Sequence, residues 1–369
     1  MKQGWEIKKI KDICDKASSN IAQNKIADID GDYPVFGASG FVQNVNFFHR
    51  DSPYVGIVKD GAGVGRVNIY PAYSSLLGTL QYIIPKEGFL LEYVAYALKS
   101  LNLASFASGA TIPHIYFKNY GESPIPVPPI AEQEKIVAEL DCLSGIIEKK
   151  KQQLKELDTL AHSIFYEMFG DPAINDRELN IKKLGDVVNS VNYGTSSPAN
   201  DGGRFTYLRM NNLTYAGYLD LKDVKSIDVP DKDLEKCVVR KGDILFNRTN
   251  SKELVGKTAL FDLNDEMVIA GYIIRVRVKA EEVLPIYVVR YMNTPFMKSY
   301  FSELCKGAVN QANINSKELK AIHIPVPSIH CQQEFASKIE AIEKQKELIK
   351  QSIQETETLF NSRMDYYFN

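Results

Sequence analysis

The chain has 369 residues, of which 44% are hydrophobic and 24% are charged, a composition that excludes a mainly disordered protein. At roughly 100–200 residues per domain, the length predicts two or three domains. The 44 basic and 46 acidic residues give a net charge of −2, which excludes a histone-like binder but allows a locally basic surface.

Targeting and metal signals are missing from the sequence. No apolar run reaches the ~18 residues of a membrane-spanning helix, and the opening Met1–Glu6 lacks the apolar core of a signal peptide. The five cysteines are scattered and form no Cys-x-x-Cys pair, which argues against a disulfide framework or a zinc site. We therefore expect a cytoplasmic protein with no metal of its own.

The first block, residues 1–124, reads as mixed α and β structure. Strands are predicted at Tyr54–Val58 and Tyr82–Ile84, and a short helix at Leu90–Ser100. The segment Asp60–Gly65 is glycine-rich and follows a strand, as a nucleotide-binding loop does. Residues 66–71 that follow it look extended rather than helical, so the pattern predicts a glycine-rich hairpin and not a phosphate site.

Residues 125–170 combine a proline-rich junction with a long helix. Apolar residues after the junction alternate steps of four and three, the a/d spacing of a coiled coil. The next block, residues 171–323, again predicts strands, at Gly242–Phe246 and Tyr272–Val278, and a helix at Ile286–Met292. Its Gly256–Thr258 resembles the end of a phosphate-binding loop, but Ser251 stands where that motif needs glycine.

Residues 324–369 repeat the earlier junction and helix. Ile125–Ile130 recurs as Ile324–Ile329, and the register then holds without a gap to the C-terminus. The beginnings of the two halves also match, Glu6–Ile13 with Asn180–Val187, at an offset that leaves about 25 extra residues in the second half. Each helix would be about 58 Å long at 1.5 Å per residue.

We expect the two helices to pair antiparallel, since a globular block separates them; separate packing of each helix on its own block is the alternative. The predicted inter-helix residues are Ile136, Leu140, Leu143, Ile147, Leu154, Leu157, Ile339, Ile342, Ile349, Ile353 and Phe360. The predicted fold is therefore α+β, with two mixed globular domains alternating with two long helices.

No catalytic motif emerges from the sequence. Instead, polar clusters lie in predicted loops of both blocks. Arginine, asparagine and glutamine match the edges of guanine and adenine, whereas lysine and hydroxyl groups suit phosphates. Each cluster taken alone is also typical of an ordinary turn, because asparagine and serine favour turns. The candidate DNA-binding residues are Lys59, Arg66, Thr111, His114, Arg209, Asn211, Arg248, Asn250, Lys252, Asn310, Gln311 and Asn313.

This arrangement resembles the specificity subunit of type I restriction–modification systems over the whole chain. The resemblance rests on these segments: Trp5–Ile13, Tyr33–Gly40, Lys59–Gly63, Gly109–Ile115 leading into Ile125–Gln133, and Lys241–Arg248 with Leu254–Lys257. The second junction departs from the first, with Ser328 for Pro129 and Cys331-Gln332-Gln333 for Glu132-Gln133-Glu134. The first block also lacks a counterpart of Asn247–Asn250, which favours two unlike DNA half-sites.

The resemblance implies that each block is a target recognition domain that reads one half of a split double-stranded DNA site. The helices would set the spacing and dock two modification subunits, which methylate adenine N6 with S-adenosylmethionine. Restriction subunits that use ATP and Mg could join them, and this chain would itself be non-catalytic. A coiled-coil adaptor without DNA specificity, or a fused methyltransferase or nuclease with unrecognised motifs, are the alternatives.

Overall fold

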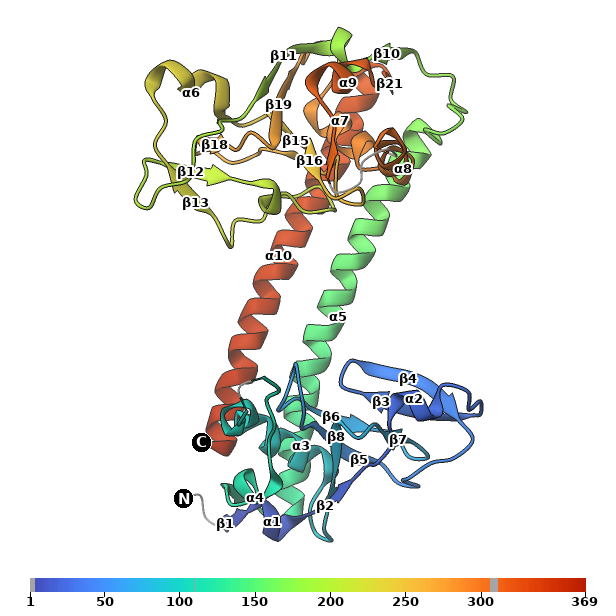
Figure 1. Ribbon diagram of the computed structural model, residues 1–369, viewed down its shortest axis with the longest axis vertical. Helices are drawn as coiled ribbons and strands as arrows, with labels where there is room; N and C mark the ends of the chain where they lie inside the picture. Colours follow the sequence, from blue (N-terminus) through green and yellow to red (C-terminus); the bar gives the residue numbers. More distant parts are fainter. Residues whose placement is uncertain (1–3, 110, 306–310) are drawn as a thin grey trace. The chain divides into compact units, whose positions relative to one another are not determined.

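The computed structural model describes residues 4–109, 111–305 and 311–369. The chain divides into two compact units, the first made of Met1–Gln152 with Ile349–Asn369 and the second of Gln153–Leu348. Both units mix helices and strands, and each contains part of both long helices, α5 (Ile130–Phe169) and α10 (Ile329–Phe368) (Figure 1). Within the described residues, no helix is long and apolar enough to cross a membrane.

The first unit is built on an antiparallel sheet of order β2-β8-β5-β6 and a smaller sheet of order β4-β3-β7. Helix α3 (Leu91–Ser100) is buried on all sides at its centre, from Tyr93 to Leu98, and strand β5 (Tyr54–Val58) is buried along its whole length. The remaining elements are β1 (Glu6–Lys9), α1 (Ile10–Ile13), β2 (Cys14–Ser18), α2 (Gln23–Ile26), β3 (Tyr33–Gly37), β4 (Gly40–Val45), β6 (Val67–Tyr70), β7 (Ser75–Leu76), β8 (Leu80–Pro85), η1 (Leu103–Phe106), α4 (Phe117–Tyr120) and β9 (Pro124–Val127).

The second unit has sheets of order β11-β19-β15-β17 and β13-β12-β18-β14, with a short β16-β20 pair. Its first strands and helices are β10 (Ile181–Lys183), η2 (Leu184–Val187), β11 (Val188–Tyr193), β12 (Phe205–Leu208), η3 (Met210–Asn212), β13 (Lys225–Ile227), α6 (Asp231–Cys237), β14 (Val238–Val239), β15 (Ile244–Asn247) and β16 (Thr249–Asn250). The others are β17 (Thr258–Leu260), β18 (Met267–Ile269), β19 (Ile273–Val278), α7 (Pro285–Met292), α8 (Pro295–Leu304), β20 (Ala312–Asn313), α9 (Ser316–Ala321) and β21 (His323–Pro325).

The two units repeat one architecture, although their blocks are mostly unalike in sequence. Strand order β2-β8-β5-β6 corresponds to β11-β19-β15-β17, and the parallel β3–β7 pair corresponds to β12–β18. The matching segments that begin the two halves form β1 and β10, which pair with β9 and β21 from the two proline-rich junctions. The second unit is longer partly because residues 209–224 join β12 to β13, where only residues 38–39 join β3 to β4.

The repeated glutamine after each junction has the same structural role in both units. Gln133 accepts a hydrogen bond from the backbone N–H of Leu90 (3.0 Å), and Gln332 accepts one from that of Leu284 (2.8 Å). Each buried amide also donates to the carbonyl of the junction, Pro128 or Pro327. Each glutamine therefore ties the beginning of a long helix to the beginning of α3 or α7, which explains the repeat in the sequence.

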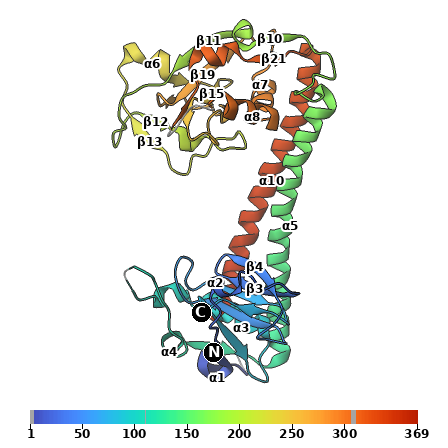
Figure 2. The same cartoon turned by 45° about the vertical axis from the view of Figure 1, so that its right-hand side comes forward.

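In each unit, the two long helices run antiparallel, as predicted (Figure 2). In the first unit, Glu139 accepts a hydrogen bond from Arg363, and Lys150 donates one to Ser352 (2.6 Å). Residue numbers therefore increase along α5 while those of the contacting residues in α10 decrease, as in an antiparallel pair. In the second unit, the Lys346 ammonium contacts Asp158 at 2.6 Å. Of the predicted inter-helix residues, Ile136, Leu140, Ile147, Ile339, Ile342 and Ile353 are buried, while Leu143, Leu154, Leu157, Ile349 and Phe360 are half-buried.

The structure combines the two arrangements considered for the helices: they pair with each other, and each also packs on its own domain. Ile136 and Leu140 belong to the same core as α3 in the first unit, and Ile339 and Ile342 belong to the core around α7 in the second. The beginning of each helix therefore packs on its own domain as well as on the other helix. A heptad pattern alone does not separate these two kinds of burial.

Candidate nucleic-acid interface

Two polar clusters predicted from the second block come together at the end of β15. Strand β16 pairs with β20, which places Thr249 opposite Asn313, and the Thr249 hydroxyl donates to the Asn313 side-chain oxygen at 2.9 Å. The backbone N–H of Arg248 donates to the carbonyl of Tyr272 (3.0 Å), and that of Ile314 donates to the Arg248 carbonyl (2.9 Å). Segments more than sixty residues apart are thereby held around Arg248.

The asparagines of this cluster bond mainly within the protein. Asn247 is fully buried, and its amide donates to the carbonyls of Thr249 (3.1 Å) and Tyr272 (3.2 Å). It accepts in turn from the Asn250 amide at 2.8 Å. Asn250 and Asn313 therefore each use one side-chain group to hold the loop, the Asn250 amide as a donor and the Asn313 oxygen as an acceptor. Gln311 is exposed and Lys252 is half-buried beside them, whereas Asn310 lies outside the described residues.

The first unit contains the same frame at the end of β5. The N–H of Lys59 donates to the Thr79 carbonyl and that of Ile115 donates to the Lys59 carbonyl, both at 3.0 Å. Asp60 forms a bridge with His114, and their side chains are hydrogen-bonded. Lys59, Asp60 and His114 thus occupy the positions that Arg248, Thr249 and Asn313 occupy in the second unit.

The charges of the first cluster compensate one another. The Lys59 ammonium lies 2.5 Å from the Asp60 carboxylate. Burial alone would raise the pKa of the Asp60 carboxyl, but hydrogen bonds from Lys59 and His114 outweigh it and leave the pKa below its ordinary value. The first unit therefore presents an internally neutralised ion pair, rather than a free cation, at this position. Thr111 is exposed on the segment that leads to His114.

The predicted glycine-rich hairpin between β5 and β6 is confirmed. Gly63 has φ +89°, and a Cβ there would lie 2.0 Å from the guanidinium of Arg66. That guanidinium folds back to donate to the carbonyls of Ala62 and Gly63, both at 3.2 Å. The glycines therefore allow Arg66 to close the hairpin, and Arg66 itself stays exposed at its edge.

A groove lies in each unit and is built from equivalent segments. A parallel bridge joins Ile21 to Leu77 in the first unit and Thr195 to Ala270 in the second. The first groove has a volume of about 750 Å³ and is lined by residues 20–23, 37–42 and 77–79. The second measures about 680 Å³ and is lined by residues 195–199, 207, 209–211, 248 and 270–272.

The two grooves present different side chains. The second contains Arg209, Asn211 and Arg248, three residues predicted from sequence, although Asp223 accepts hydrogen bonds from Arg209 (3.0 Å) and Asn211 (3.3 Å). The first is lined largely by small residues, with Phe41 61% exposed at the end of the β3–β4 turn. Sequence reasoning missed this groove, although Asn20 and Gln23 are among its lining residues, because most of its lining is small or apolar and its segments are brought together only by the fold.

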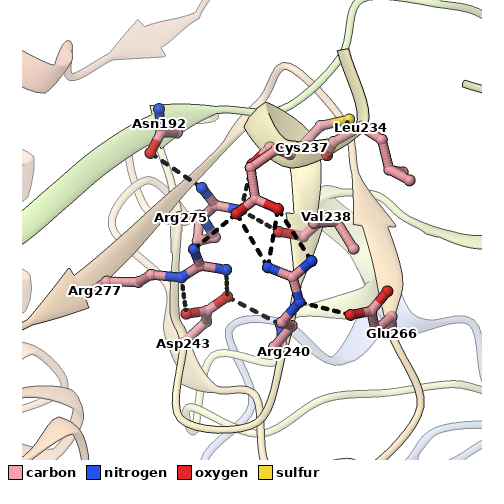
Figure 3. Close-up of polar contacts among 10 residues, drawn as sticks. Asn192, Leu234, Cys237, Val238, Arg240, Asp243, Glu266, Arg275 and Arg277 are labelled. Atoms are coloured by element: carbon pink, nitrogen blue, oxygen red, sulfur yellow. Dashed lines mark hydrogen bonds and ion pairs between the residues drawn. The ribbon is translucent and has the colours of Figure 1, made fainter. Parts of the chain in front are cut away.

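A further arginine cluster in the second unit is engaged in ion pairs (Figure 3). Arg277 lies 2.8 Å from Asp243, and Arg240 lies 2.6 Å from Glu266. Arg275 is buried and donates to the backbone carbonyl of Val238 and, at 3.1 Å, to Asn192. These arginines stabilise the end of α6 and its sheet, so their charges are not available at the surface as an uncompensated patch.

The insertion 209–224 is tied to the long helices within the second unit. The hydroxyl of Tyr218 donates to Glu343 (2.8 Å) and accepts from the buried Lys346 (2.8 Å). Burial alone would lower the pKa of Lys346, but hydrogen bonds to Asp158 and Tyr218 outweigh it and raise the pKa above its usual value. The insertion that carries Arg209 and Asn211 is therefore anchored to α10 through Tyr218.

No group of three or more His, Cys, Asp or Glu side chains within residues 4–109, 111–305 and 311–369 is arranged to hold a metal ion. A protein-family model for the type I restriction modification DNA specificity domain matches the chain twice, over residues 2–158 and 177–358. The two matches correspond closely to the two structural repeats.

Curated relatives carry the same description. The chain is 23% identical over 272 residues to the specificity subunit of the type I restriction enzyme EcoKI from Escherichia coli K12, covering 69% of this chain and 58% of that protein. It is 24% identical over 288 residues to the MjaIX specificity subunit from Methanocaldococcus jannaschii, covering 66% of each chain. The chain thus spans less than two thirds of the length of these relatives.

Solved structures share the fold. The S subunit of a type I restriction–modification system from M. genitalium superposes with a TM-score of 0.64 at 15% identity, covering 99% of this chain and 96% of that one. A chain from a structural study of assembly and conformational transition in a type I R-M system superposes with a TM-score of 0.57 at 17% identity, covering 98% and 97%.

Proposed function

This chain belongs to the type I restriction–modification DNA specificity family, and we propose that it is the subunit that recognises the DNA sequence in such a complex. Each of its two units reads one half of a split site in double-stranded DNA. The proposal rests on one observation above all. The same backbone frame presents Lys59, Asp60 and His114 in the first unit and Arg248, Thr249 and Asn313 in the second.

The difference between the frames favours an asymmetric target. Base edges are distinguished by the donors and acceptors that side chains direct at them. The first groove is lined by small residues and an exposed phenylalanine, which suit apolar contacts such as the thymine methyl group, together with Asn20 and Gln23, whereas the second adds arginines, which suit guanine. Two unlike grooves on one repeated frame therefore predict two unlike half-sites. A coiled-coil adaptor would have no reason to gather Arg248 and Asn313 around one loop.

The long helices set the spacing between the half-sites in this proposal. Helices α5 and α10 each contribute to both units, so the number of base pairs between the half-sites is a property of helix length. Two modification subunits dock on this chain and supply adenine N6 methylation with S-adenosylmethionine. Restriction subunits, where present, supply ATP- and Mg-dependent cleavage. The chain itself contributes recognition rather than catalysis and acts in the cytoplasm.

The proposal is tested by selecting DNA with the assembled complex. The chain is purified with its modification subunits and mixed with duplexes that contain a long random region, and bound duplexes are sequenced. We expect enrichment of two different short sequences separated by a fixed number of unselected base pairs. A stable complex that enriches no sequence, or one uninterrupted sequence, would contradict the split-site proposal.

A further inference from the structure

We propose that Arg248 reads a guanine in the second half-site and that Tyr193 positions its guanidinium for this contact. The inference rests on the proposed function, because it presumes that the second groove meets base edges. It goes further by assigning one base contact to one side chain. It also gives a role to Tyr193, a residue outside the set of candidates found by sequence.

The guanidinium of Arg248 differs from the others of the second unit in having no hydrogen-bond or ion-pair partner among the described residues. Its Nε atom is shielded from solvent without a partner, as are those of Arg209, Arg275 and Arg290, but the guanidinium groups of these three arginines have other partners. Every other arginine of this unit has a carboxylate or carbonyl partner: Arg177, Arg204, Arg209, Arg240, Arg275, Arg277 and Arg290. A half-buried and uncompensated cation is costly unless a ligand satisfies it.

The ring of Tyr193 holds this guanidinium in place. The centre of the Arg248 guanidinium lies 4.8 Å from the Tyr193 ring centroid, within the range of a cation–π contact. The Tyr193 hydroxyl is itself held, because it accepts a hydrogen bond from the backbone N–H of Ser316 at 2.8 Å. Both backbone groups of Arg248 are bonded to neighbouring segments. The side chain is therefore presented at the groove with few conformations to lose on binding.

A planar fork of donors held in this way matches guanine. Arginine donates two parallel hydrogen bonds to guanine O6 and N7, the commonest specific contact in the major groove, whereas adenine offers a donor at the position of O6. Arg209 lines the same groove but is already bonded to Asp223. In the first unit, Lys59 occupies the equivalent position and is neutralised by Asp60, so we assign no guanine contact there.

The experiment measures binding of the assembled complex to duplexes that carry its selected target. Each guanine of the second half-site is replaced in turn by 7-deazaguanine, which lacks the N7 acceptor. We expect one position at which wild-type affinity falls by roughly 5-fold or more, because 7-deazaguanine removes one of the two acceptors of a bidentate contact that is worth roughly 5- to 150-fold as a whole. In Arg248→Ala the same replacement should change affinity less than twofold, since the contact is already gone.

Variants of Tyr193 separate positioning from folding. Tyr193→Phe keeps the ring and should retain most of the sensitivity to 7-deazaguanine, whereas Tyr193→Leu should lose most of it. Arg204→Ala removes an exposed arginine of the same unit and should leave the sensitivity unchanged. If Arg248→Ala abolishes binding, Arg248→Lys, which cannot form the planar fork, replaces it in the comparison.

Each outcome decides between the two proposals. A second half-site without a G·C pair, or a 7-deazaguanine effect that persists in the Arg248 variants, overturns the guanine assignment and leaves the recognition role intact. Equal sensitivity in Tyr193→Leu and wild type overturns the role of Tyr193. Failure of the wild-type complex to select any sequence instead contradicts the proposed function itself.

Discussion

Replacing Gln332 with alanine should loosen the contact between the beginning of α10 and the beginning of α7. Gln332 is fully buried, accepts from the Leu284 N–H at 2.8 Å and donates to the Pro327 carbonyl at 2.9 Å. Gln332→Ala leaves these two backbone groups without partners, the Pro327 carbonyl in a buried place and the Leu284 N–H in a partly buried one. At about 1–3 kcal/mol for each unsatisfied group, we expect a loss of about 3 kcal/mol in local stability.

Hydrogen exchange followed by mass spectrometry measures this loss where it occurs. A loss of about 3 kcal/mol in the free energy of local opening corresponds to a roughly 100-fold faster exchange. Peptides that begin α7, including Leu284, should show this acceleration in the second unit. Gln333→Ala is the matched control, because Gln333 is the next residue along the chain and its side chain is exposed. Exchange at Leu284 that accelerates no more in Gln332→Ala than in the control would refute the reasoning.

Two further predictions concern polar contacts of the second unit. Tyr218→Phe removes the hydroxyl that bonds Lys346 and Glu343, and it should lower the free energy of unfolding, measured in urea, by about 2 kcal/mol. Tyr215 is exposed, so Tyr215→Phe is the control and should leave the free energy of unfolding nearly unchanged. Hydrogen bonds from two arginines hold the pKa of Glu235 at about 2, below its usual value, so its stabilising contribution is present above about pH 4.5 and is lost as pH falls toward 2. The stability difference between wild type and Glu235→Gln should therefore vanish over that interval, and a difference that persists at pH 2 would contradict the assignment.

The long helices and their junctions could be predicted because their signals are local and repeated. The heptad spacing predicts a long helix after each proline-rich junction, and the structure begins α5 at Ile130 and α10 at Ile329. The repeated glutamine was visible as a match, but its contact with Leu90 or Leu284 was not. Such a contact spans more than forty residues and depends on how the helix packs on its domain.

The structural equivalence of the two blocks could not be predicted from the sequence, because it rests on hydrogen bonds between backbone groups. The carbonyls of Thr79 and Tyr272 hold Lys59 and Arg248 in the same way, and a backbone hydrogen bond places no demand on side-chain identity. The two loops can therefore diverge completely while their frame persists. This is the physical condition under which a recognition surface changes its target without changing its fold.

The structure brings together several polar residues that the sequence marked as candidates, but the sequence did not indicate what each of them bonds. The polar clusters of the second block do meet, as at Thr249 and Asn313. Composition does not distinguish an amide that bonds its own loop, such as that of Asn250, from a side chain that remains available, such as Arg248. Tyr193 gave no signal because a partly exposed tyrosine at a strand end is common, and its partner lies fifty-five positions away.

The measurement that tests the central claim most directly is the position of methylated adenines in genomic DNA. The chain is co-expressed with its modification subunit in a host without adenine methylation, and N6-methyladenine is mapped by sequencing. We predict one split motif with two unlike halves, and relaxed specificity in the second half alone for Arg248→Ala. A single unsplit motif, or no new methylation despite a stable complex on co-purification, would contradict the account.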